Sequence, residues 1–151
     1  MNRFLQVVAL GIFAATAPLK ASPGSAMLEE RYKAALNDMV QEVRNTPDPA
    51  AKRQILEHFI THMSQGLEKA EAMQSISEQD RASLHSVLGK FYAYDSELKG
   101  MPGFAPVADA NLDGFAGYIQ QGMEQAPVGG GIYLSGGAII IILLILLLLI
   151  R

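Results

Sequence analysis

His58 and His62 are the residues of this chain whose types and spacing most favour metal chemistry. Four residues apart on a helix, two imidazoles lie on one face and can bind the same Zn²⁺ ion. A zinc-protease helix carries a glutamate directly after its first histidine, whereas Phe59 stands at that position here. The alternative is a pair of histidines at the edge of a solvated helix face. His58 and His62 are therefore the candidate metal ligands, and the sequence predicts no other cofactor.

The remaining reactive side chains lack the surroundings that catalysis requires. Glu57, Glu68 and Glu71 are typical of a solvated helix face, whereas a catalytic carboxylate pair needs burial or a partner that shifts its pKa. The glycines within residues 129–137 precede an apolar run and follow no strand, which excludes a phosphate-binding loop. The chain has no cysteine, which excludes disulfides and thiol catalysis. We predict no catalytic residue and no enzymatic activity.

Three segments show the apolar spacing of amphipathic helices, within residues 27–100. The second begins with Asp48 as N-cap and Pro49 at the first helical position. The third begins at Ser77 and ends at Gly100. The three apolar stripes are Leu28, Tyr32, Leu36, Met39, Val40 and Val43; Ile55, Leu56, Phe59, Ile60, Met63, Leu67 and Ala70; and Leu84, Val87, Leu88, Phe91, Tyr94 and Leu98. Short links between amphipathic helices predict an all-α fold, a small antiparallel bundle.

Residues 101–131 are rich in proline and glycine and contain the pattern of a possible fourth helix, over residues 110–125. Its glycines each cost a helix about 1 kcal/mol relative to alanine, so it forms only by packing on the bundle or on a partner. Its apolar residues recur at steps of three and four, and we predict them as a partner-binding face: Leu112, Phe115, Ile119 and Met123.

The aromatic residues allow two interpretations, core filling or an exposed partner surface. We expect Phe91 and Phe115 in the core. For Tyr92 and Tyr118 both interpretations stay open.

Both ends of the chain are apolar, in different ways. Arg3 followed by the apolar residues 4–17 and then by small residues and prolines is typical of an export signal, which we place at residues 1–26. Residues 132–151 carry one charge, Arg151, and have the roughly twenty residues that a helix needs to cross a bilayer. We therefore predict one C-terminal transmembrane helix, with residues 27–131 on the extracytoplasmic side, which in a bacterium with two membranes is the periplasm.

The translocated part is acidic. All fifteen acidic residues of the chain lie in it, against nine of the twelve basic ones, which argues against nucleic acid as a partner. Small exported eukaryotic domains often need disulfides, so the absence of cysteine favours a bacterial cell envelope.

The C-terminal run contains only isoleucine and leucine over residues 139–150, which argues against transport through it. Small residues precede it and are candidates for helix association or for processing: Gly131, Ser135, Gly136 and Gly137. This tail resembles the bacterial CTERM sorting signals of the GlyGly type, with Gly129-Gly130-Gly131 or Ser135-Gly136-Gly137, then the apolar run, then Arg151. The resemblance implies cleavage near the glycines and transfer to another anchor.

The sequence thus predicts a single-pass, membrane-anchored helical module that binds or scaffolds a protein partner in the envelope. The bilayer is its other partner, and a homo-oligomer is possible. The alternatives are a membrane-active or oligomerising assembly element, or a substrate of a CTERM-like sorting system. A retained anchor ranks first, such sorting second, and a GPI signal third.

Overall fold

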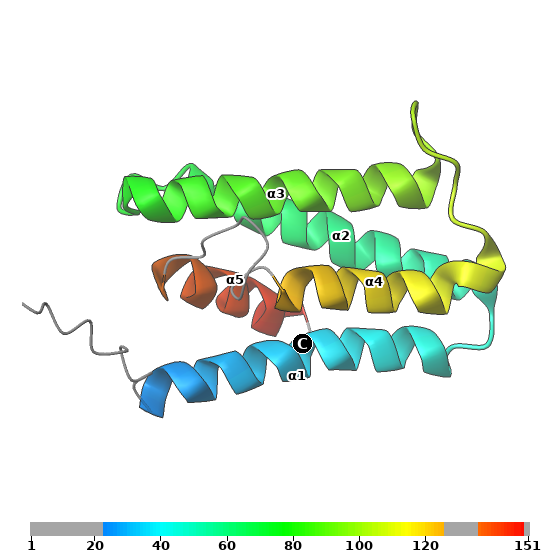
Figure 1. The fold of residues 1–151 in the computed structure, drawn as a ribbon, viewed down its shortest axis with the longest axis horizontal. Coiled ribbons are helices and arrows are strands. Elements are labelled where there is room, and N and C mark those ends of the chain that lie inside the picture. Colours follow the sequence, from blue (N-terminus) through cyan, green and yellow to red (C-terminus); the bar gives the residue numbers. More distant parts are fainter. Residues whose placement is uncertain (1–22, 126–135, 150–151) are drawn as a thin grey trace, which may run out of the picture.

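The computed structural model describes residues 23–125 and 136–149, and every regular element in these two ranges is helical. Three long helices run along the molecule, and two shorter ones lie in opposite halves of its length (Figure 1). The elements are α1 (Pro23–Asn45), α2 (Pro49–Glu71), α3 (Glu78–Lys99), the 3-10 turn η1 (Asp109–Asn111), α4 (Leu112–Glu124) and α5 (Gly136–Leu149). The prediction of an all-α bundle is confirmed.

Local chemistry sets the ends of α2 and α3. Asp48, the residue before Pro49, caps α2: its side chain accepts hydrogen bonds from the backbone N–H groups of Ala50 (3.4 Å) and Ala51 (3.1 Å). Ser77 accepts from the Asp80 N–H at 3.0 Å and donates its own hydroxyl to the Asp80 carboxylate at 2.7 Å. Gly100 ends α3 at φ 71°, in the left-handed region that favours glycine. These boundaries match the sequence prediction.

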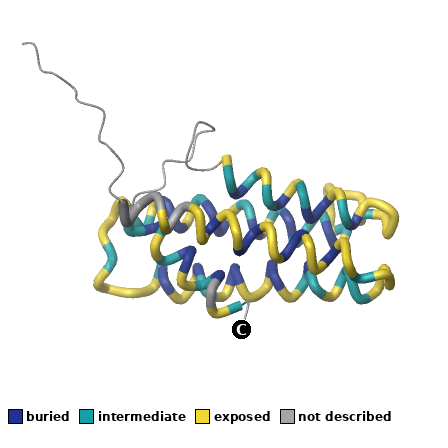
Figure 2. The backbone as a smooth tube through the Cα atoms, turned by 90° about the horizontal axis from the view of Figure 1, so that it is seen from below, coloured by how far each residue is buried: buried dark blue, intermediate teal, exposed yellow. Residues whose placement is uncertain are grey.

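The inner sides of the helices form one apolar core (Figure 2). Of the three predicted stripes, every residue whose burial the structure describes is buried except Ile55, which is half-buried. Phe91 and Phe115 lie in this core, as predicted, whereas Tyr92 and Tyr118 are each 48% exposed.

Hydrogen bonds and ion pairs tie α4 to the long helices. Tyr32 on α1 donates its hydroxyl proton to the carbonyl of Met123 at 3.0 Å, and Lys90 on α3 donates to the carbonyl of Gly122 at 3.1 Å. Both bonds satisfy carbonyls near the end of α4, where a helix leaves them without internal partners. The predicted fourth helix therefore exists, packed on the bundle.

Two basic residues of α2 hold the chain on either side of η1. Lys52 forms an ion pair with Asp113. Arg53 donates to the carbonyls of Leu98 (2.9 Å) and Val107 (2.7 Å) and to the carboxylate of Asp109 (2.9 Å). One guanidinium thereby connects α2, the end of α3 and the entry to α4.

The C-terminal apolar helix lies against the bundle, which the sequence did not predict. Its described part, α5, has 14 residues and contacts α1, α2 and α3. Across the two ranges that the structure describes, no helix is both long and apolar enough to span a membrane. The predicted transmembrane helix thus gains no support from these residues. The rest of it, residues 132–135 and 150–151, lies outside them, as does most of the predicted export signal. α1 itself begins at Pro23, inside that predicted signal.

Candidate functional site

The groove that α1, α2 and α3 form around α5 is the most distinctive site of the molecule. The helix lies in the half of the bundle opposite to α4 (Figure 1). Four of its side chains are buried there, with exposed fractions of 2% or less: Ala138, Ile142, Leu143 and Leu146. The helices α1, α2 and α3 therefore enclose the inner side of α5, and we call the space that they form around it the groove.

The outward side of α5 is as apolar as its buried side. Ile140, Leu144 and Leu148 follow one another at steps of four residues and are 44%, 55% and 75% exposed. We call these three residues the outer stripe. A surface helix of a bundle normally carries polar residues on this side, as α2 does with Gln65, Glu68 and others. The outer stripe leaves α5 apolar all round.

A glycine on α2 allows α5 to approach closely. A β-carbon built at Gly66 would lie 2.6 Å from Cγ2 and 3.0 Å from Cγ1 of Ile145. The shorter distance is essentially never seen for a real β-carbon, so a side chain at position 66 would force the Ile145 side chain or the two helices to shift. Gly66 thus forms a notch in the groove that receives Ile145.

Asp80 marks the other end of the same groove. A β-carbon at Gly137 would lie 2.7 Å from both carboxylate oxygens of Asp80, so this acid lies against the first turn of α5. The positive end of a helix dipole favours a carboxylate at this place. Asp80 also takes part in the capping bonds with Ser77, which fix its position at the start of α3.

A trough of about 540 Å³ lies between α1 and α2, at the point where α5 ends. Apolar residues including Phe59 and Leu149 line it, together with the polar side chains of Asp38, Glu42 and His58. These three polar residues are exposed, so the trough is an open surface feature.

The candidate metal ligands His58 and His62 do lie side by side. Their ring centroids are 4.1 Å apart, and both residues are exposed. His85, on α3, is 2.9 Å from the Glu71 carboxylate of α2 and does not join them. Within residues 23–125 and 136–149 no group of three or more His, Cys, Asp or Glu residues is arranged to hold a metal ion. Zinc binding by His58 and His62 stays a prediction.

The predicted partner-binding face of α4 is directed into the bundle. Leu112, Phe115, Ile119 and Met123 are at most 7% exposed. In this arrangement their side chains are covered by the protein itself. Partner binding through them stays a prediction, and it would require α4 to move.

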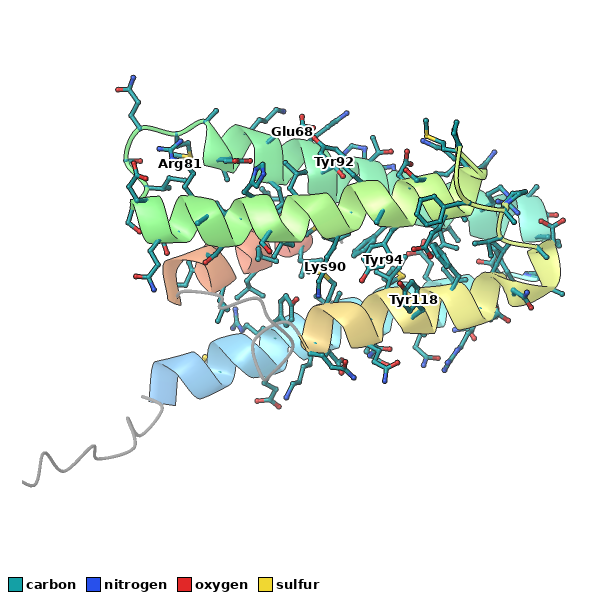
Figure 3. The ribbon with its side chains drawn as sticks, turned by 45° about the horizontal axis from the view of Figure 1, so that its top comes forward. Glu68, Arg81, Lys90, Tyr92, Tyr94 and Tyr118 are labelled. Carbon is teal, nitrogen blue, oxygen red and sulfur yellow. The ribbon has the colours of Figure 1, made fainter. Side chains whose placement is uncertain are left out.

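Tyrosines line the contact between α3 and α4. Tyr94 of α3 and Tyr118 of α4 meet edge to face, with centroids 5.4 Å apart (Figure 3). The Tyr94 hydroxyl lies where a side chain at Gly122 would otherwise be, 2.2 Å from the position of a β-carbon there. Burial, assisted by Tyr118 and Glu97, raises the pKa of Tyr94 to about 12.

Another tyrosine links α3 to α2 at the surface. Tyr92 donates its hydroxyl proton to Glu68 at 2.5 Å, and this bond is the main cause that raises the pKa of Tyr92 (Figure 3).

Arg81 donates to the carbonyls of Glu71 and Met73 and so closes the end of α2.

The predicted small-residue patch is described only in part. Gly136 and Gly137 form the start of α5, whereas Gly131 and Ser135 lie outside the described residues. Helix association or processing at these four residues stays a prediction.

Sequence reasoning missed Gly66 and Asp80. Gly66 lies within the apolar stripe of α2, between Met63 and Leu67. Glycine weakens a helix, so a glycine at such a position indicates that another part of the protein packs closely there. Asp80 follows Ser77 by three residues, and this spacing indicates only a capping role. Neither signal identifies α5 as the neighbour, because that contact depends on the tertiary arrangement.

No protein-family model matches this chain, no curated protein matches it, and no solved structure is significantly similar to it.

Proposed function

We propose that the protein is a membrane-tethered helical module, anchored through residues 132–151, whose bundle binds or organises a protein partner on the extracytoplasmic side of the membrane. The single observation that carries the anchor is the outer stripe. A helix that is apolar on every side is suited to surroundings that are apolar on every side.

The charge of the bundle supports the same proposal. All acidic residues of the chain lie in residues 27–131, and the tail carries none. The tail can therefore enter hydrocarbon without burying an acid, while the acidic bundle stays in water. Its net negative charge also disfavours flat docking on an anionic lipid surface.

The anchor is tested with a unique fluorophore. The chain has no tryptophan, so Leu148→Trp places the only one on a residue of α5 that is 75% exposed. The full chain is reconstituted from detergent into phosphatidylcholine and phosphatidylglycerol vesicles whose acyl chains carry bromine near the middle of their length, the depth of residue 148 in a span over residues 132–151. We expect a blue-shifted emission and strong quenching, because the indole then lies in the hydrocarbon core.

The matched control adds Leu144→Glu to the same chain. Leu144 is 55% exposed, so glutamate is compatible with the folded bundle, whereas in the centre of a bilayer it is strongly unfavourable. The control is expected to lose the quenching. If the tryptophan of the Leu148→Trp variant keeps the emission of a water-exposed indole in brominated vesicles, the proposed anchor is wrong.

The position of the bundle is tested separately, in bacterial cells. Alkaline phosphatase inserted after residue 125 is active only outside the cytoplasm, and a fluorescent protein at the same point is bright only inside it. We expect an active phosphatase and a dark fluorescent protein. The reverse pair would contradict the extracytoplasmic bundle.

A further inference from the structure

We propose that the groove between α1, α2 and α3 is a storage site for the membrane anchor. α5 docks there while the protein is off the membrane, and it leaves the groove to enter the bilayer. This inference rests on the proposed function, because it adds a regulated step to the same anchor.

The two sides of α5 show that the groove is one of two environments for this helix. The side chains of Ile142 and Leu146 are buried in the groove, whereas Leu144 and Leu148 face water. A helix with one permanent place in a bundle needs apolar residues on its inner side alone. Aliphatic residues on the outer side have a use only where that side also meets an apolar medium.

The groove is nevertheless shaped for α5. Gly66 leaves the space that Ile145 enters, and the Asp80 carboxylate lies against the first turn of the helix at Gly137. A nonspecific apolar surface requires neither a notch on one wall nor an acid at the positive end of the incoming helix. The docked position therefore has a defined register.

Transfer of α5 from the groove to the bilayer changes apolar contacts in two opposite directions. Side chains that leave the groove for the bilayer stay in an apolar medium, and the outer stripe gains burial by the transfer. Against this, the transfer exposes the apolar walls of the groove to water. The apolar surface of α5 thus favours the bilayer, whereas the exposed walls of the groove favour docking, and contact with a bilayer can shift the equilibrium between the two.

A reversible disulfide between the notch and its occupant tests the inference. The chain has no cysteine, so Gly66→Cys with Ile145→Cys creates the only pair. The Cγ2 atom 2.6 Å from the β-carbon position at Gly66 is one bond from the β-carbon of Ile145, so the two β-carbons lie within the upper limit of ~4.5 Å for a disulfide. The double variant is made in the Leu148→Trp chain.

We expect the membrane-free protein to form an intramolecular disulfide on mild oxidation. The oxidised protein, mixed with detergent and the brominated vesicles, should show no deep quenching. Reduction with dithiothreitol should restore quenching to the level of the Leu148→Trp chain. The single variants Gly66→Cys and Ile145→Cys should show no dependence on dithiothreitol.

Three outcomes would overturn the storage site. If the pair stays reduced in the membrane-free protein, α5 does not dock in the groove. If crosslinking produces dimers, a second copy supplies the helix. If the oxidised protein is quenched as strongly as the reduced one, docking in the groove does not keep α5 out of the bilayer.

A failure of the proposed function gives a different result. In that case the reduced protein and the Leu148→Trp chain both stay unquenched, while the disulfide still forms.

Discussion

Tyr32 and Met123 are 91 positions apart in the chain, and the hydroxyl of Tyr32 donates a hydrogen bond to the Met123 carbonyl at 3.0 Å, in a buried position. This bond ties the first part of the bundle to the last turn of α4. Burial raises the pKa of Tyr32 well above its usual value, with Glu124 and Tyr94 adding to the effect, so the hydroxyl keeps its proton.

Replacing Tyr32 by phenylalanine is expected to lower the free energy of unfolding by about 1 kcal/mol, because the Met123 carbonyl then stays buried without this donor. Urea unfolding followed by circular dichroism measures the change. Tyr118→Phe removes a hydroxyl from a residue that is 48% exposed and should stay within about 0.5 kcal/mol of the wild type. Equal effects of the two variants would contradict a structural role for the Tyr32 bond.

Two residues of α5 test whether the helix is docked in solution. Leu146 is fully buried and Leu148 is 75% exposed. Leu146→Ala is expected to cost about 2–5 kcal/mol of unfolding free energy, because it leaves a cavity in the groove. Leu148→Ala should stay within about 0.5 kcal/mol. Thermal or urea unfolding without detergent compares them, and indistinguishable midpoints would argue for an undocked α5.

Gly66→Ala and Gly89→Ala form a second matched pair. Alanine in place of glycine inside a helix normally stabilises by up to about 1 kcal/mol. At Gly89 an added β-carbon meets no atom within 4 Å, so we expect this gain in full. At Gly66 the β-carbon meets Ile145, so the gain should be lost or reversed. A stabilised Gly66→Ala variant, measured by urea unfolding, would show that no close approach exists there.

Arg53→Met removes the guanidinium that holds α2, the end of α3 and the entry to α4, while it keeps much of the side-chain volume. We expect a loss of about 1.5–3 kcal/mol, because hydrogen bonds to a charged group are stronger than neutral ones. Amide hydrogen exchange should accelerate most between residues 101 and 111. Lys69→Met, at an exposed position of the same helix, is the control and should leave this exchange unchanged.

The pKa of Tyr94 predicts how stability depends on alkaline pH. The pKa of Tyr94 is raised to about 12 in the folded protein, whereas an unperturbed tyrosine has a pKa of about 10. As pH rises above about 10, the unfolded chain releases this proton before the folded protein does, so stability falls between about pH 10 and 12. Below that range the contribution is fully present.

Tyr94→Phe should therefore show a shallower decline of unfolding free energy between pH 10 and 12 than the wild type. Some decline should stay, because the pKa of Tyr32 is raised as well. Denaturant unfolding at several pH values measures it, with pH 7–9 as the reference range. The same slope in both proteins would mean that Tyr94 is ionised as easily in the folded protein as in the unfolded chain.

Much of the bundle could be predicted because its signals are local. Asp48, Ser77 and Gly100 set their helix ends through bonds or dihedral angles within a few residues, and apolar spacing identified the buried faces. The place of α5 could not be predicted in this way. A uniformly aliphatic run is the same signal for a membrane helix and for a buried one, and the groove that distinguishes them is assembled from three other helices.

The candidate site was less accessible to sequence reasoning than the fold. In the sequence, Gly66 is only a residue that lowers the helix propensity of α2, and its role becomes clear when Ile145 is found beside it. His58 and His62 were found from their spacing, yet spacing alone does not show which other ligands approach them. Such contacts join positions far apart in the chain, where periodicity carries no information.

The two short helices, α4 and α5, lie at opposite ends of the bundle, and the contacts that hold them differ. Hydrogen bonds from Tyr32 and Lys90 reach the last turn of α4, and an ion pair with Lys52 holds its first turn. If α5 left the groove, the end of the bundle that contains α4 would stay packed. Only the end that contains Gly66 and Asp80 would be exposed. The molecule would then behave as two cooperative units, one that opens only on global unfolding and one that opens at far lower cost.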